Sequence, residues 1–146
     1  MDFHNLLENL KKQSFFSNLI IERGIEKESL RVTKNGYISN KKHPETLGSS
    51  YTNPSITTDF AESLIEIVTP TYTSVDELYE KLKIIHIFIN QNLKDGEMLW
   101  PFSMPPKIED ETKINIATYG KTNMGRLKHV YRKGLAIRYG KTMQCV

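Results

Sequence analysis

Apolar residues recur along the chain with two different spacings, which divide it into predicted helices and strands. Near the start they return every three or four positions, which predicts a helix over 3–10 with one apolar face, made of Phe3, Leu6, Leu7 and Leu10. From Leu19 to Thr33 the pattern shifts towards that of a strand. Lys34-Asn35-Gly36 then predicts a hairpin turn that leads to residues 37–38.

The middle of the chain predicts a loop followed by a segment of uncertain type. Residues 40–56 are rich in Pro, Ser, Thr, Asn and Gly, which is typical of a loop. Residues 56–69 are apolar with isolated acids, and their periodicity fits both a helix and a strand. The β-branched residues at the end of this segment favour a strand there.

Two helices are predicted in the second half. Ser74 and Glu77 have the spacing of a capping box, which opens an amphipathic helix that we expect to stop near Gly96. Residues 99–112 contain three prolines and cannot form a regular helix. Helical spacing returns over 123–138. Together these elements predict an α+β chain with no linker that would divide it.

Length and composition are those of one globular domain. The chain has 146 residues, of which 38% are hydrophobic and 25% charged. Cys145 is the only cysteine, which excludes a disulfide framework and cysteine-rich zinc sites. The start of the chain does not resemble a secretory signal, and its most apolar window, Ile84–Ile89, is far too short to span a membrane. A cytoplasmic location is therefore expected.

Positive charge is concentrated in the last part of the chain. Residues 119–146 contain seven Lys and Arg and no acid, whereas residues 1–118 contain 13 basic and 17 acidic residues. Such a block fits an RNA surface, a site that neutralises phosphates, or an ordinary solvated helix.

Acidic residues recur in two segments and suggest a metal site. Glu26 and Glu28 would point to one face of a strand, where two close carboxylates repel unless a cation lies beside them. Asp59, Glu62 and Glu66 interrupt an apolar stretch, where isolated charges are costly to bury. Carboxylates from both segments would suit Mg²⁺, although a solvated strand face or amphipathic segment explains the same pattern.

Several motifs, taken in order, resemble the proteobacterial type of glutamate–cysteine ligase. The resemblance runs from about residue 19 to the last residue and is carried by these segments: Arg23-Gly24-Ile25-Glu26-Lys27-Glu28-Ser29-Leu30-Arg31-Val32, Thr57-Thr58-Asp59-Phe60-Ala61-Glu62, Thr69-Pro70, Trp100-Pro101-Phe102-Ser103-Met104-Pro105, Tyr119-Gly120, Gly125-Arg126, Tyr131-Arg132, Gly134-Leu135 and Arg138-Tyr139-Gly140.

This resemblance implies a fold and an activity. The fold would be a glutamine-synthetase-like antiparallel sheet funnel with helices packed outside. The activity would be ATP-dependent joining of the γ-carboxylate of L-glutamate to the amino group of L-cysteine, the first step of glutathione biosynthesis. In the family, ATP phosphorylates the γ-carboxylate, and the cysteine amine then displaces phosphate from the γ-glutamyl phosphate.

The resemblance also implies roles for individual residues. The Mg²⁺ ions that hold ATP and glutamate would be bound by four carboxylates: Glu26, Glu28, Asp59 and Glu66. Tyr131 and Leu135 fall where the family shapes the cysteine pocket, and Arg126 and Arg132 could face the phosphates. No residue of this chain is assigned as a catalytic acid, base or nucleophile.

Family members are far longer than 146 residues and continue past Val146 with a Gly-x-His-Tyr-Asn-like stretch, whose histidine belongs to the active site. Residues 1–146 are thus expected to be the amino-terminal, incomplete part of a single ligase catalytic domain, inactive alone. Two alternatives remain open from the sequence: a non-catalytic remnant of the ligase and, less favoured, a small basic RNA-binding module.

Overall fold

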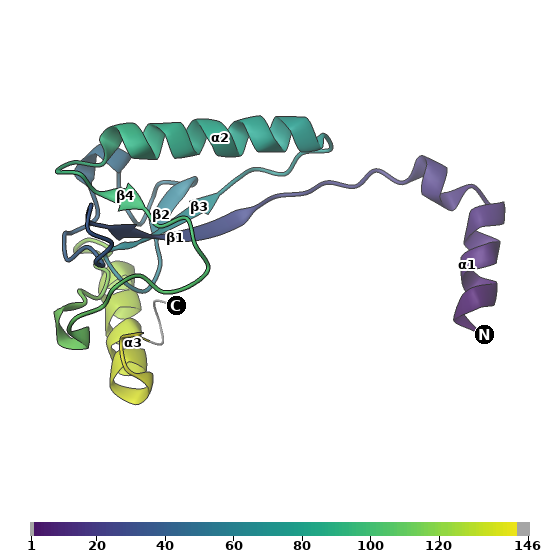
Figure 1. Ribbon diagram of the computed structural model, residues 1–146. Helices are drawn as coiled ribbons and strands as arrows, with labels where there is room; N and C mark the ends of the chain where they lie inside the picture. The colour runs from purple at the N-terminus through teal and green to yellow at the C-terminus, as the bar shows by residue number, and fades with distance from the viewer. Residues whose placement is uncertain (1, 143–146) are drawn as a thin grey trace.

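A four-stranded antiparallel sheet lies at the centre of the computed structural model, which describes residues 2–142 (Figure 1). The elements follow one another in this order: α1 (Phe3–Lys12), the 3-10 turn η1 (Phe15–Asn18), β1 (Glu26–Val32), η2 (Glu45–Leu47), β2 (Ile56–Thr58), β3 (Leu64–Val68), α2 (Val75–Asn92), β4 (Met98–Leu99), η3 (Glu111–Lys113) and α3 (Asn123–Tyr139). The strand order is β2-β3-β1-β4. This architecture confirms the predicted α+β class and the antiparallel sheet.

The register of the sheet decides which side chains share a face. β1 pairs with β3 from Glu26 opposite Val68 to Leu30 opposite Leu64. β2 pairs with the other edge of β3, and β4 pairs with the end of β1. The segment 56–69, which fits both helix and strand by periodicity, therefore forms two strands joined by a tight turn. Because successive side chains of a strand point to opposite faces, one face carries the isoleucines of β2 and β3 together with Lys27, Ser29 and Arg31 of β1. The other face is divided between apolar and acidic side chains.

The face that carries these isoleucines is covered by α2. The buried cluster on this side consists of Leu47, Ile56, Ile65, Ile67, Ile85 and Ile89. The Ser74 hydroxyl accepts a hydrogen bond from the Glu77 backbone N–H at 3.3 Å, which confirms the predicted start of the helix. The helix ends at Asn92 and not near Gly96, because Leu93 takes an extended conformation and packs against this core.

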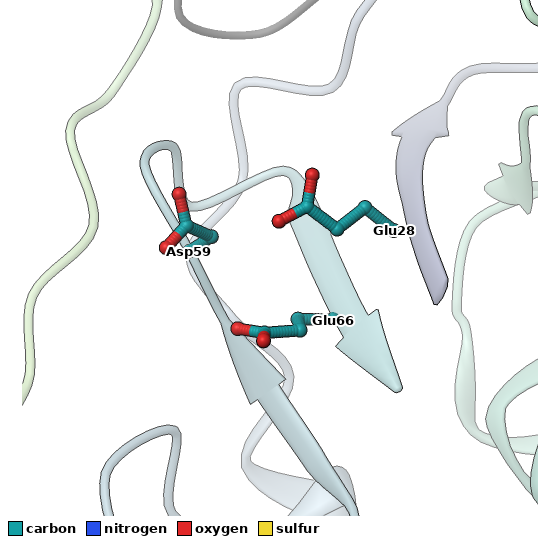
Figure 2. Close-up of side chains that lie close together, drawn as sticks. All are labelled: Glu28, Asp59 and Glu66. Atoms are coloured by element: carbon teal, nitrogen blue, oxygen red, sulfur yellow. The ribbon is translucent and has the colours of Figure 1, made fainter. Parts of the chain in front are cut away.

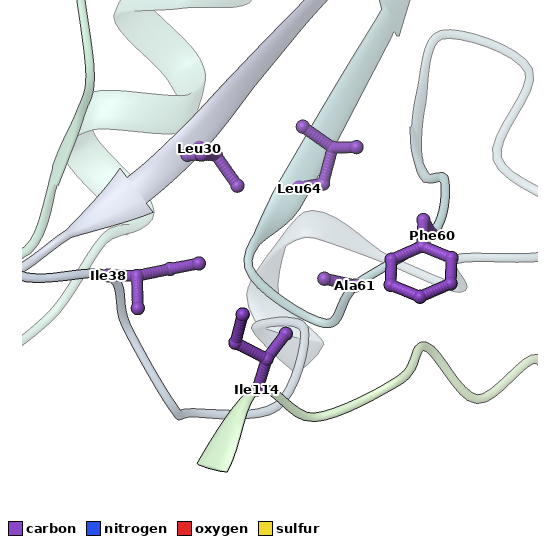
Figure 3. Close-up of a cluster of buried hydrophobic side chains, with 6 residues drawn as sticks. All are labelled: Leu30, Ile38, Phe60, Ala61, Leu64 and Ile114. Atoms are coloured by element: carbon purple, nitrogen blue, oxygen red, sulfur yellow. The ribbon is translucent and has the colours of Figure 1, made fainter. Parts of the chain in front are cut away.

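The opposite face is covered only in part. There, six buried residues form a second cluster, shown in Figure 3: Leu30, Ile38, Phe60, Ala61, Leu64 and Ile114. Leu135 and Ala136 of α3 pack against it, as does Trp100 from the proline-containing segment. Beyond Leu30 and Leu64, the same face carries the acids Glu28 and Glu66 in place of apolar side chains.

Residues 2–25 form an arm that leads away from the sheet. Figure 1 shows α1 at the far end of an extended segment. The predicted helix is confirmed, but the strand expected from Leu19 begins only at Glu26. Before it, Arg23 makes an isolated bridge with Tyr72. A strand needs a neighbour to complete its hydrogen bonds, and in the described part of the chain 19–22 has none in the sheet.

The remaining predictions hold with small differences. The turn at 34–36 is present, with Gly36 at a positive φ of 78° and its N–H bonded to the Thr33 carbonyl. α3 matches its predicted range within one residue. Among residues 2–142, none of the helices has the length and apolar character needed to cross a bilayer. Cys145 and the end of the chain lie outside the described residues.

Candidate metal centre

Three carboxylates from different segments meet on the uncovered part of the sheet. Glu28 of β1 is directly opposite Glu66 of β3, so their side chains leave the same face. Asp59 follows the last residue of β2 and brings its carboxylate to the other two (Figure 2). One oxygen from each of Glu28, Asp59 and Glu66 lies within 4.8 Å of the others. A cation placed among them could contact oxygen atoms from all three.

The tight turn between β2 and β3 brings Asp59 to this position. The Thr58 hydroxyl lies 2.8 Å from the Ala61 carbonyl oxygen and 2.7 Å from that of Leu64, inside the turn. The Asp59 N–H reaches the Leu64 carbonyl at 3.3 Å, longer than the usual 2.9–3.0 Å. The Tyr119 hydroxyl contacts the carbonyl oxygens of Thr58 and Asp59 from below.

The electrostatics of the cluster favour a bound cation. Partial desolvation raises the pKa of the Glu28 carboxyl, and the negative charges of Asp59 and Glu66 raise it further. The pKa of Glu66 is raised in the same way, with Asp59 and Glu26 as the nearby charges. Ionising Glu28 or Glu66 therefore costs free energy in this environment, and a bound divalent cation would remove that cost.

One side of the cluster is already neutralised by α3. Arg132 makes a two-pronged ion pair with Asp59, with Nη1 3.0 Å from Oδ2 and Nη2 against Oδ1. Both side chains are mostly buried, at 15% and 27% exposure. Two parallel N–H···O bonds of this kind fix the direction of a carboxylate as well as its charge. No local pattern in the sequence predicts this pair, since its members are 73 residues apart.

The donor set fits a hard divalent cation such as Mg²⁺. Three carboxylates offer only oxygen, which Mg²⁺ prefers, and it keeps other positions for water and phosphate oxygens. The fourth expected ligand, Glu26, lies two residues before Glu28 on the same strand face, but it is not among the three that converge. Its charge still acts on the cluster by raising the pKa of both glutamates.

Glu62 proves to be a structural residue, although it belongs to the same run of acids. It is 3% exposed, and its carboxylate accepts hydrogen bonds from the His43 N–H at 2.9 Å and from the Thr118 N–H and hydroxyl at 3.0 and 2.6 Å. Its oxygen atoms are therefore directed into the protein, away from Glu28 and Glu66. The periodicity of the sequence could not show this, because the turn before Leu64 interrupts it.

A recess adjoins the carboxylates. Glu28, Leu30 and Leu64 form one side of a cavity of about 200 Å³, and the segment 100–106 forms the other. Within that segment the Trp100 indole donates a hydrogen bond to the Met104 carbonyl at 2.6 Å, which holds the segment in a closed loop. A ligand bound at the carboxylates would thus find an aromatic and apolar wall beside it.

The residues expected at the substrate are spread along α3. Tyr131 is exposed and lines a mostly apolar hollow of about 450 Å³ together with Tyr51, Met124, Leu127 and Lys128. Leu135, one turn later, is half-buried and packs against the core below the sheet. Arg126 is exposed near the start of the helix, whereas Arg132 is held by Asp59. The structure brings only Arg132 into contact with the acidic cluster.

The basic end of the chain is used in part for internal contacts. Besides Arg132, Lys128 lies 4.0 Å above the centre of the Tyr119 ring. Lys141 donates to the carbonyls of Thr112 and Ile114, both at 2.8 Å. These contacts account for three of the seven cations and reduce the charge that an RNA surface would need.

Comparison with known proteins finds relatives over nearly the whole chain. A family model described as glutamate–cysteine ligase matches residues 5–146. The glutamate–cysteine ligase of Hahella chejuensis is 49% identical over 140 residues, which is 96% of this chain and 27% of the relative. That of Pseudomonas aeruginosa is 54% identical over 123 residues, 84% of this chain and 23% of the relative. The chain thus spans about a quarter of the length of these curated relatives.

Solved structures agree with the fold. The crystal structure of glutamate–cysteine ligase from Francisella tularensis in complex with AMP superimposes with a TM-score of 0.82 and 42% identity, over 86% of this chain and 25% of that one. A bifunctional glutathione synthetase from Pasteurella multocida gives a TM-score of 0.81 and 32% identity, over 95% of this chain and 18% of that one. The match of sequence and fold across nearly all of its residues shows that the chain belongs to the glutamate–cysteine ligase family.

Proposed function

We propose that this chain is the amino-terminal part of a single catalytic domain that joins the γ-carboxylate of L-glutamate to the amino group of L-cysteine at the expense of ATP. The observation that carries the proposal is the convergence of Glu28, Asp59 and Glu66 within 4.8 Å, in a chain of this family. The AMP bound to the Francisella tularensis relative supports a nucleotide substrate. A cytoplasmic location stays a prediction from the sequence.

The residues present fit a role in phosphoryl transfer. That reaction depends mainly on positioning and on neutralising the charge of the transferred phosphoryl group. Mg²⁺, when bound, would supply that neutralisation. Glu28, Asp59 and Glu66 would hold it, with Glu26 contributing charge from the same strand. Arg132 fixes the direction of the Asp59 carboxylate, and Arg126 is exposed near the start of α3, where it could meet phosphates.

The pocket for cysteine is proposed at α3. Tyr131 lines the apolar hollow beside the cluster-bearing face, which suits a small side chain with a thiol. Leu135 supports the same helix from the core side. In this arrangement the amine of cysteine would attack the γ-glutamyl phosphate and release phosphate, giving γ-glutamylcysteine.

Metal titration tests the proposal directly. We expect isothermal titration of the chain with Mg²⁺ to show binding, and Glu66→Gln to weaken it by at least about tenfold. Glu80→Gln is the matched control, since Glu80 is an exposed glutamate on α2 that pairs with Lys83, one turn later on the same helix. Equal affinities for the wild type and both variants would contradict the site.

The 146-residue chain is not expected to complete the reaction alone, because it covers about a quarter of its relatives. The test is an assay of ADP release from ATP with Mg²⁺, glutamate and cysteine present. Release that depends on all three and disappears in Glu28→Ala would refute this expectation. Metal binding without ADP release would support it.

A further inference from the structure

Tyr119 is a buried tyrosine whose hydroxyl contacts the backbone at Thr58 and Asp59, next to the acidic cluster. It is 1% exposed, and its hydroxyl is 3.1 Å from the Thr58 carbonyl oxygen and also donates to that of Asp59. A tyrosine hydroxyl carries its proton at neutral pH and can therefore donate to these carbonyls. Both of its partners belong to the turn that presents the Asp59 carboxylate.

Contacts on both sides of Tyr119 hold it firmly in place. A Cβ atom on Gly125 would lie 2.2 Å from the Tyr119 carbonyl oxygen, so only glycine allows the first turn of α3 to pack this closely. Lys128, one turn later, lies over the tyrosine ring. On the other side, Thr118 is bound by the buried Glu62 carboxylate through two hydrogen bonds. Tyr119 thus has little freedom to move relative to the sheet or to α3.

The Asp59 backbone depends on this support. Its own N–H makes only the long 3.3 Å bond to Leu64. Its carboxylate is held by Arg132, which comes from the helix that Tyr119 packs against. The backbone and the side chain of Asp59 are therefore both positioned by residues 119–132, a segment more than 50 residues away in the sequence.

We propose that Tyr119 is a positioning residue for the metal centre: its hydroxyl fixes the turn at Thr58 and Asp59, so that the Asp59 carboxylate converges with Glu28 and Glu66. This inference rests on the proposed function, because it assumes that the three carboxylates bind a divalent cation. Tyr119 itself does not reach the cation. Partners that orient metal ligands in this way commonly change metal affinity 10- to 100-fold when removed.

The test compares metal binding with stability. Tyr119→Phe keeps the ring and removes only the hydroxyl. The probe is Mn²⁺, a paramagnetic ion that also takes oxygen ligands, and its free concentration is followed by electron paramagnetic resonance. The matched control is Tyr37→Phe, because Tyr37 also has a lysine, Lys107, over its ring at 5.2 Å but lies on a different loop. Thermal unfolding of each variant is measured in parallel, without metal.

We expect Mn²⁺ to bind about tenfold more weakly to Tyr119→Phe and unchanged to Tyr37→Phe. A second variant, Thr118→Val, leaves Tyr119 intact but removes the 2.6 Å bond from the Thr118 hydroxyl to Glu62, and should weaken binding about threefold. Unchanged Mn²⁺ affinity in both variants, with a loss only of thermal stability, would overturn the positioning role and leave the metal site intact. Absence of Mn²⁺ binding to the wild type would instead refute the metal site, and this role with it.

Discussion

Replacing Arg31 with methionine should lower the free energy of unfolding more than replacing a surface lysine, such as Lys41, with methionine. The Arg31 side chain is fully buried, and Nη1 donates to both carboxylate oxygens of Glu97 at 3.0 and 3.1 Å. Nη2 donates to the carbonyl oxygens of Lys41, Lys42 and Glu62 at 2.7, 2.9 and 2.8 Å. One guanidinium therefore joins β1, the loop after residue 39, the β2–β3 turn and the segment before β4.

The magnitude follows from what the substitution leaves behind. The Glu97 side chain is 4% exposed and would keep its hydrogen bond from the Ser39 hydroxyl but lose its cation, and the Glu62 carbonyl would lose a buried donor. A cavity of about 320 Å³ borders Arg31 and Glu97 as well as Lys41 and Lys42, so water can reach part of what the substitution exposes, which favours the lower end of the cost. Breaking a buried ion pair from one side costs about 3–5 kcal/mol, and we expect Arg31→Met to fall in this range. That is a large share of the 5–15 kcal/mol typical of a whole domain.

Urea unfolding followed by the fluorescence of the single tryptophan, Trp100, measures this cost. Lys41→Met is the control, because Lys41 pairs with Asp95 on the surface, where both are at least half exposed, and should cost less than about 1 kcal/mol. The double variant Arg31→Met/Glu97→Leu should be more stable than Arg31→Met alone, since it also removes the unpaired charge. The reasoning fails if Arg31→Met costs no more than the control.

Three further outcomes test other parts of the structure. Gly125→Ala should destabilise the chain by about 1–3 kcal/mol, because the new Cβ would lie 2.2 Å from a backbone carbonyl oxygen. Gly134→Ala has nothing within 4 Å of the new Cβ and should stabilise α3 by about 0.5–1 kcal/mol. Thermal or urea unfolding of both variants separates the effect of close packing from that of helix propensity. Ser74→Ala should cost about 1 kcal/mol in the same measurement by removing the cap of α2, and an unchanged midpoint would contradict the cap. Because the pKa of Glu28 is raised, the folded state binds the carboxyl proton of Glu28 more tightly than the unfolded state does. Without metal, the protonated group therefore stabilises the fold below its ordinary pKa, and this stability is lost as the pH rises through the raised pKa. Glu28→Gln should therefore gain a solvent-screened amount below about 1 kcal/mol at pH 7 and flatten the pH dependence of stability, and a variant less stable than the wild type at pH 7 would refute this sign.

Elements with strong local signals could be predicted from the sequence. The cap at Ser74, the turn at 34–36 and the helical spacing of 123–138 each depend on residues within a few positions of one another. The element ends that differ from the prediction depend on contacts between residues far apart in the sequence. The strand expected from Leu19 is shortened because only residues from Glu26 onwards find a partner in the sheet, and α2 ends early because Leu93 packs into the core.

The candidate site shows the same division. Glu28, Asp59 and Glu66 could be picked out from the sequence, because isolated carboxylates in apolar segments are costly to bury without a partner. Their convergence could not be derived, because it depends on the β1–β3 register and on the turn after Thr58. The roles of Glu62 and Tyr119 depend on contacts with residues 56 to 61 positions away, which no local pattern in the sequence predicts.

The pairing of Glu28 with Glu66 also has a consequence for how the strands find each other. A slip of one residue between β1 and β3 would turn Glu66 towards the face covered by α2 and bring Ile65 and Ile67 out to solvent. Placing a carboxylate among those isoleucines would cost far more than the repulsion it escapes. The acids therefore act against a one-residue slip during folding, because that slip would take one of the two carboxylates off the face that water can reach.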